Sequence, residues 1–330
     1  MMKTPEEAEL CFPQLLNSSC RKTQRPEFVS MLTYIILSSI SLITVTLNLL
    51  VIISISHYKQ LHTPTNFLLL SLAVSDFFVG VLMLFQMVLL DGCWVLGNFM
   101  CAVYYVLDYA LTSASIGTMV LISVDRYVAI CDPLHYTTKV TQKRVQLCVC
   151  LCWMCSALCH SLLLKDSLER PGRYNSCFGE CVVVIDYIAG LTDLFLSFIG
   201  PVIVVVVLYI RVFVVVVSQA HAMRSHTGAN TLNHSVKMTA KKSEMKAAGI
   251  LGVVVVVFLI CVCPYFCVAL TGQDTKLNAS SSAFVICLFY FNSCLNPVIY
   301  AVFYPWFRKS IKLIVTLQIL KHGSCETCIS

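Results

Sequence analysis

Seven long apolar runs constrain the fold of this chain more than any other feature. They fall near 31–57, 66–90, 98–131, 143–164, 187–218, 239–271 and 279–303. A helix needs roughly 20 apolar residues to cross a bilayer, and each run is at least that long. Only 12% of the residues are charged, which is about half the share in a soluble domain. The sequence therefore predicts an all-α membrane protein built as a seven-transmembrane helix bundle.

Basic residues gather on one side of this predicted bundle. They lie in the first, third and fifth connections and in the tail, whereas the N-terminal segment and the other connections mix both signs. The positive-inside rule then places the N-terminus outside and the tail in the cytosol. The net charge of +6 thus reflects membrane orientation and not nucleic-acid binding. We expect an extracellular segment over 1–30, a membrane domain over 31–303 and a cytoplasmic part over 304–330.

The outer side carries groups that suit an oxidising compartment. Asn17 begins an Asn-Ser-Ser glycosylation acceptor. Disulfides are expected among the outer cysteines, although their spacing does not fix the pairing. These cysteines are Cys11, Cys20, Cys93, Cys101, Cys177 and Cys181.

The third apolar run carries charge near both of its ends. Asp108 lies in its outer half, and Asp125, Arg126 and Tyr127 close its inner end, about 27 Å away along a helix. Ionisable groups at membrane depth are costly and usually functional. We therefore expect a cation to be sensed at Asp108 and its binding to be reported at Arg126.

A second outer carboxylate, Asp193, lies in the fifth run. Two carboxylates in a low-dielectric cleft repel each other unless cations neutralise them, and a ligand with two ammonium groups would do so. Alternatively, Asp193 faces polar loop residues or pairs with a lysine such as Lys165. Nearby aromatic side chains would attract an alkylammonium through cation–π contacts, or they would only pack. They are Tyr265, Phe266 and Tyr290.

Two other intramembrane clusters have a functional and a structural interpretation. Asp76, with Ser115, Asn292 and Asn296, would form a small pocket for a cation such as Na⁺, or a structural hydrogen-bond network. The fourth run holds Cys148, Cys152, Cys155, Cys159 and His160 on one helical face. We interpret this second group as packing and not as a metal site, because cysteine behaves as a small buried hydrophobe.

The last two runs and the tail predict moving and membrane-bound parts. Pro264 interrupts backbone bonding in the sixth run and provides a pivot, and Glu244 at its inner end is a partner for Arg126. After the seventh run a short amphipathic eighth helix is expected on the inner leaflet, with Trp306, Phe307 and Ile311 toward lipid and basic side chains at the headgroups. Cys325 and Cys328 beyond it are candidates for palmitoylation.

Several of these residues stand in motifs of a known family. The DRY triplet at 125–127 and the NPVIY stretch at 296–300, together with Asn48, the LAVSD stretch at 72–76, Trp153, Pro201 and Pro264, resemble the rhodopsin-class G-protein-coupled receptors. Residues 292–307 also fit the signature NSxxNPxxYxxxYxWF of the trace amine-associated receptors at every fixed position. The resemblance covers the whole membrane core.

This resemblance implies roles for individual residues. It implies the disulfides Cys101–Cys181 and Cys20–Cys177, and an amine site at Asp108 and Tyr290, with Tyr109 and Thr112 beside the anchor on the third helix. It implies a G-protein switch formed by Asp125, Arg126, Tyr127, Tyr209, Glu244, Asn296, Pro297 and Tyr300. Ile116, Pro201 and Phe258 match the central packing triad. The sequence departs from the family at Val262, where a tryptophan is usual, and this change is expected to enlarge the pocket floor.

The resemblance also implies a function. Aspartate at the position of Asp193 occurs in olfactory trace amine receptors that respond to diamines. We expect a plasma-membrane receptor for diamines or polyamines, in sensory cilia if it is olfactory, that acts through a stimulatory or olfactory G protein to raise cAMP and that arrestin binds. Alternatives are a monoamine receptor with a structural Asp193 and a polyamine transporter. An enzyme is not expected, because no catalytic motif stands out.

Overall fold

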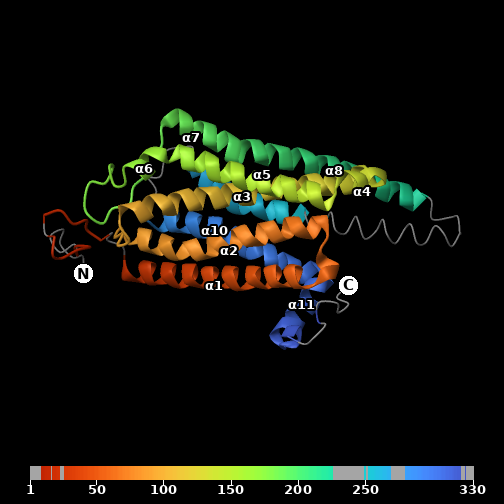
Figure 1. The fold of residues 1–330 in the computed structure, drawn as a ribbon, viewed down its shortest axis with the longest axis horizontal. Helices are drawn as coiled ribbons and strands as arrows, with labels where there is room; N and C mark the ends of the chain where they lie inside the picture. The colour runs from red at the N-terminus through yellow and green to blue at the C-terminus, as the bar shows by residue number, and fades with distance from the viewer. Residues whose placement is uncertain are drawn as a thin grey trace.

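The computed structural model describes residues 9–15, 17–22, 26–225, 249, 252–268, 279–320 and 324, and these form a bundle of long helices (Figure 1). The long helices are α1 (Glu27–His57), α2 (Pro64–Leu90), α3 (Asn98–Cys131), α5 (Gln142–Leu163), α8 (Gly200–Ser225), the helix Gly252–Val268 and α10 (Ala279–Phe303). The shorter ones are η2 (Lys59–Leu61), η3 (Pro133–His135), α4 (Tyr136–Lys139), α6 (Lys165–Glu169), α7 (Tyr187–Leu194), α11 (Pro305–Val315) and η5 (Gln318–Leu320).

The all-α prediction is confirmed over the described residues, which contain two isolated β-bridges and no strand. Six of the described spans are long and apolar enough to cross a membrane, and the helix Gly252–Val268 is a shorter apolar one. A π-helical turn over Phe195–Ile199 joins α7 to α8, so that both belong to one membrane-length span. Of the predicted run 239–271, the structure describes residues 249 and 252–268, and Glu244 lies outside the described residues.

Local sequence explains where several helices begin. The Thr63 hydroxyl accepts a hydrogen bond from the backbone N–H of Asn66, and Pro64 occupies the first turn of α2. Thr141 caps α5 in the same way, and the Asp186 carboxylate accepts from the backbone N–H groups of Ile188 and Ala189 in the first turn of α7. Such caps satisfy donors that have no partner within the helix. These caps define where each helix starts, whereas apolar content alone gives only an approximate start. Helix α2, for example, begins two residues before the predicted run.

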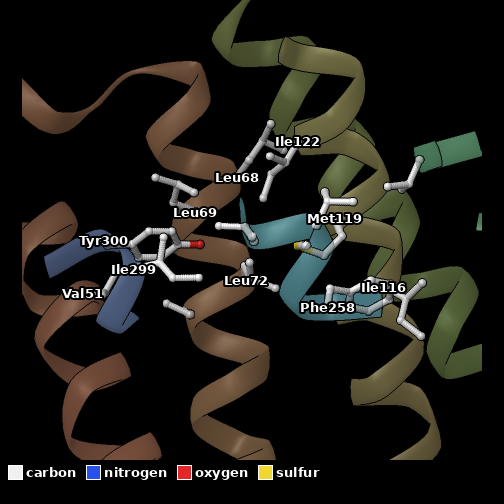
Figure 2. Close-up of a cluster of buried hydrophobic side chains, with 14 of the residues drawn as sticks. Val51, Leu68, Leu69, Leu72, Ile116, Met119, Ile122, Phe258, Ile299 and Tyr300 are labelled. Carbon is white, nitrogen blue, oxygen red and sulfur yellow. The ribbon is translucent and has the colours of Figure 1, made fainter. Parts of the chain in front are cut away.

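Helix α3 lies at the centre of the bundle and contacts α2, α5 and α8. The main buried cluster forms around its inner half. Ile116, Met119 and Phe258 lie on one side of this cluster, and Ile299 and Tyr300 lie on the other (Figure 2). Because α3 is packed on several sides, residues at its two ends are held at a fixed separation.

Three disulfides join the segments at one end of the bundle, which we call the disulfide end. Cys20–Cys177 and Cys101–Cys181 are the pairs that the family resemblance implies, and Cys11–Cys93 is a third pair. The backbone N–H of Phe178 donates to the Ser18 carbonyl at 2.6 Å, so the N-terminal segment also pairs with the loop before α7. Asn17 lies exposed at this end.

The opposite end, which we call the arginine end, carries Arg126 and the short helix α11. Figure 1 shows that the chain turns after α10, so that α11 lies at an angle to the bundle at this end. The prediction that Phe307 faces lipid is wrong, because its side chain is completely buried and belongs to the main cluster. Trp306 packs against the cluster of Tyr58 and Leu61. The amphipathic helix is thus fastened to the bundle by its first turn. Cys325 and Cys328 lie outside the described residues.

Candidate functional site

A cavity of about 520 Å³ opens between α3, α5, α7, the helix Gly252–Val268 and α10. All seven residues that the sequence proposes for ligand binding line it. They are Asp108, Tyr109, Thr112, Asp193, Tyr265, Phe266 and Tyr290. The helix order therefore brings side chains that are as much as 182 positions apart, as Asp108 and Tyr290 are, into one compartment.

Asp108 projects into this cavity from α3 with few partners. Its Oδ1 accepts one long hydrogen bond of 3.4 Å, from the Tyr290 hydroxyl. Among the described residues no basic side chain forms a salt bridge with it. A carboxylate at membrane depth is costly without a counter-charge, so Asp108 can accept a cation from outside the chain.

Asp193 lines the same cavity but has partners within the chain. Its Oδ1 accepts a hydrogen bond of 2.8 Å from the Ser197 hydroxyl and lies 3.1 Å from Nε2 of His160 on α5. The suggested pairing with Lys165 is not what the structure contains, since Lys165 instead lies 3.5 Å from Glu169. The side chain of Asp193 is still 29% exposed. It can therefore contact a ligand, although part of its hydrogen-bonding capacity is already used.

Sequence reasoning considered His160 only as a member of the cysteine cluster. In the structure Cys148, Cys155 and Cys159 are exposed on the outside of α5, whereas His160 is buried and turned inward. Over the described residues no group of three potential metal ligands converges. The missed signal was helical spacing, because His160 lies one turn after Ser156, whose hydroxyl donates to Ser113 on α3.

Aromatic rings form much of the cavity wall. Phe266 stacks on Phe198 with ring centroids 3.9 Å apart, and Tyr265 lies 4.7 Å from Phe289. Phe289 in turn meets the edge of Tyr290 at 5.5 Å. These rings pack against one another, and Tyr265, Phe266, Phe289 and Tyr290 also face the cavity. The packing interpretation is therefore confirmed, whereas a cation–π contact with a ligand stays a prediction. Their faces offer cation–π contacts beside the two carboxylates.

Val262 does not line this cavity. It lines an adjoining space of about 20 Å³, whose lining includes Phe258 and Asn292 and which shares Thr112 and Ile116 with the cavity. Val262 thus lies next to the inner end of the cavity. The expectation that Val262 enlarges the pocket floor stays a prediction.

The Asp76 cluster forms beside this adjoining space, which Ser115 and Asn292 line. Asp76 is completely buried and accepts hydrogen bonds from Nδ2 of Asn296 at 2.8 Å and from the Ser115 hydroxyl at 3.4 Å. The Oδ1 atoms of Asn292 and Asn296 are also buried and have no hydrogen-bond partner among the described residues. Carboxylate and amide oxygens are the ligands that hard cations prefer. The residues present thus fit a small cation.

At the arginine end, Asp125 is surrounded by donors. It accepts hydrogen bonds from Tyr136 at 2.8 Å, Thr65 at 3.0 Å and Nε of Arg126 at 2.9 Å. Arg126 also donates to the Thr65 hydroxyl at 2.7 Å. Sequence reasoning missed Thr65 and Tyr136, which lie in other segments. Glu244, the expected partner of Arg126, lies outside the described residues.

Further residues of the predicted switch surround this network. Tyr127 packs in a small cluster with Ile130 and Val212. The hydroxyls of Tyr209 and Tyr300 are buried, with no hydrogen-bond partner within the described chain, and Pro297 lies inside α10. In the connection after α3, hydrogen bonds from Lys139 and His135 lower the pKa of Asp132, which stays ionised in this basic segment.

Comparison with known proteins gives consistent results. Residues 47–300 match the family described as 7 transmembrane receptor (rhodopsin family). The chain is 36% identical to trace amine-associated receptor 4 of Mus musculus, over 99% of both chains. It is 39% identical to trace amine-associated receptor 6 of Homo sapiens, over 96% of this chain and 94% of the relative. It is also 39% identical to trace amine-associated receptor 13c of Danio rerio, over 97% and 95% respectively.

Proposed function

The chain belongs to the trace amine-associated receptors, within the rhodopsin family of seven-transmembrane receptors, and from this premise we propose that it detects diamines or polyamines. It is a multi-pass membrane protein and not an enzyme. The observation that carries the proposal is that Asp108 and Asp193 line a single cavity of about 520 Å³. One dication can neutralise both carboxylates, whereas a monoamine can neutralise only one.

Each part of the cavity has a role in this proposal. Asp108 binds one ammonium group, assisted by the Tyr290 hydroxyl that already contacts its Oδ1. Asp193 binds the second ammonium group. Tyr109, Thr112, Tyr265 and Phe266 surround the alkyl chain and the charges. Cation–π contacts of roughly 0.5–2 kcal/mol add to the two ion pairs.

A monoamine ligand is the second candidate. The observation in its favour is that Asp193 already accepts from Ser197 and lies beside His160, as a structural carboxylate would. Asp108 would then be the only ligand anchor, and the rest of the cavity would hold an apolar group. A polyamine transporter is the less favoured candidate, and uptake of labelled polyamine into vesicles would distinguish it.

The orientation and location follow from chemistry. The disulfide end faces outside, because disulfides persist in oxidising compartments and Asn17 is a glycosylation acceptor there. The arginine end faces the cytosol and its G protein. The protein resides in the plasma membrane, and in sensory cilia if its role is olfactory.

Ligand binding favours a state in which the sixth transmembrane helix swings about Pro264 and frees Arg126. The ligand shifts this equilibrium only through its unequal affinity for the two states. In the resting state Arg126 is held by Asp125 and Thr65, and Glu244 is the additional partner we propose. The released end engages a stimulatory or olfactory G protein and later arrestin.

The Asp76 cluster binds Na⁺ in the resting state. This part of the proposal is supported by the buried carboxylate and by the two amide oxygens without partners in the described chain. The ion would be held by Asp76, Ser115, Asn292 and Asn296. It would supply the positive charge that the buried carboxylate needs.

A panel of monoamines, diamines and polyamines in a cAMP reporter assay tests the function. We expect a diamine of matched length to be more potent than the monoamine in cells that express the chain, and no response in untransfected cells. Equal potency of matched mono- and diamines would favour the monoamine receptor. Polyamine uptake without a cAMP response would overturn the receptor function.

A further inference from the structure

His160 has an unusual position for a histidine in an apolar helix. Its side chain is only 2% exposed and lies at the edge of the amine cavity. Nδ1 lies 2.7 Å from the backbone carbonyl oxygen of Ser156, and Nε2 lies 3.1 Å from Oδ1 of Asp193. The imidazole thus joins the second carboxylate of the cavity to the backbone of α5.

These two contacts fix where protons must lie. A carbonyl oxygen only accepts, so Nδ1 must carry a proton that it donates to Ser156. Oδ1 of Asp193 is also an acceptor when ionised, so the contact with Nε2 needs a second proton. The pair therefore holds one proton more than a neutral imidazole and a carboxylate anion contain. In this state the His160–Asp193 pair has no net charge, so Asp193 offers no uncompensated charge to a ligand.

The other charged groups around the pair are few. His160 meets the ring of Tyr109 on α3 at a centroid distance of 6.1 Å. The remaining titratable groups that line the same cavity are Tyr105 and Asp108 on α3, Asp186 and Tyr187 at the start of α7, Tyr265 and Tyr290. Cys159 adjoins His160 on α5 but is exposed. None of the groups that line the cavity is a lysine or arginine. The proton shared with His160 is therefore the cation nearest to Asp193 in the described part of the chain.

We propose that His160 is a specificity-determining residue, at which a bound proton competes with the second ammonium group of a diamine for Asp193. This rests on the proposed diamine function and adds a control to it. When the ammonium group enters, the shared proton leaves to solvent. The imidazole becomes neutral, keeps its Nδ1–H bond to Ser156 and turns its Nε2 lone pair into an acceptor for the ligand N–H.

The direction of the pH effect follows from this exchange. Imidazole changes charge between about pH 5 and 8, whereas alkylammonium groups remain charged over that range, as lysine does. Diamine binding releases a proton, so acid opposes it and alkali favours it. A monoamine bound at Asp108 leaves the His160–Asp193 pair intact and releases no proton. External acidity therefore lowers the preference of the receptor for diamines.

The test compares 1,5-diaminopentane with 1-aminopentane in cells that express the full chain, with external pH varied from about 6 to 8. We expect the concentration for half-maximal cAMP to rise for the diamine by up to about tenfold per pH unit of acidification. The monoamine curve should shift by less than about twofold. His160→Gln keeps an amide beside Asp193 but does not titrate, so its diamine curve should lose the pH slope. His62→Gln, at the arginine end, is the control histidine and should retain it.

Each outcome decides the proposal. Equal pH slopes for the two amines in the unaltered receptor, or an unchanged diamine slope in His160→Gln, would overturn it while leaving the diamine function standing. Surface labelling reports whether His160→Gln reaches the membrane; if it does not, the unaltered receptor's two slopes decide alone. Absence of any amine response at any pH would overturn the proposed function itself, and this inference with it.

Discussion

The carboxylates at the two ends of α3 differ in how much of their hydrogen-bonding capacity the chain satisfies. Asp125 at the arginine end accepts from Tyr136, Thr65 and Arg126 and is almost completely buried. Asp108 in the cavity accepts one bond of 3.4 Å. Buried charges are stable only when they are paired and hydrogen-bonded. Asp125 is therefore satisfied within the chain, whereas Asp108 keeps free hydrogen-bonding capacity for the ammonium group that we propose.

Asp193 is intermediate between these two. It has a hydroxyl and an imidazole within reach, but 29% of its side chain is exposed. A ligand at Asp193 must therefore share or replace contacts that already exist. This is why we expect the two carboxylates of the cavity to contribute unequally.

The largest effect is expected at Asp108. Asp108→Asn removes the unpaired charge, and amine potency in the cAMP assay should fall by about 30-fold or more, because losing one partner of a buried ion pair costs about 2–5 kcal/mol. Asp91→Asn, at the same end but not lining the cavity, is the matched control and should respond normally. A normal dose–response curve for Asp108→Asn would remove its anchor role.

A smaller and selective effect is expected at Asp193. Asp193→Ser should weaken the response to 1,5-diaminopentane by roughly 10- to 100-fold and to 1-aminopentane by less than about threefold, because only the dication loses an ion pair and this site is partly solvated. Ser197→Ala removes one hydrogen bond to Asp193 and should cost only about two- to tenfold. If Asp193→Ser lowers the potency of both amines equally, the result favours the monoamine receptor over the diamine receptor.

A change in resting activity is expected at the arginine end. Asp125→Asn weakens the hold on Arg126, and basal cAMP without ligand should rise by about two- to fivefold, because a loss of roughly 1 kcal/mol shifts a two-state equilibrium by that order. The measurement is cAMP per receptor at the cell surface. Basal cAMP at the level of the unaltered receptor would show that Asp125 does not restrain activation.

The smallest effect is expected at Asp76. If Na⁺ stabilises the resting state, replacing extracellular Na⁺ with N-methylglucamine should raise amine potency by about two- to threefold, as a ligand selective for one state does. In Asp76→Asn the amine dose–response curve should be the same with and without extracellular Na⁺. Retained sensitivity in the variant would place the ion elsewhere.

The sequence alone determined the parts of this protein that depend on local physics. The lengths of the apolar runs predicted the membrane helices because a bilayer has a fixed thickness. Thr63, Thr141 and Asp186 could be recognised as helix starts, since a cap acts on the next few residues. Asp108 and Asp193 were found because ionisable residues are rare at such depth.

Only the tertiary structure decided how distant segments face one another. Four features do not follow from spacing along the chain. They are the Cys11–Cys93 disulfide, the contact of His160 with Asp193, the burial of Phe307, and the hydrogen bonds from Thr65 and Tyr136 to Asp125. Helical periodicity gives the face on which a side chain lies, but not the neighbour that this face meets. That neighbour depends on the rotation and packing of whole helices, which all the contacts of the bundle set together.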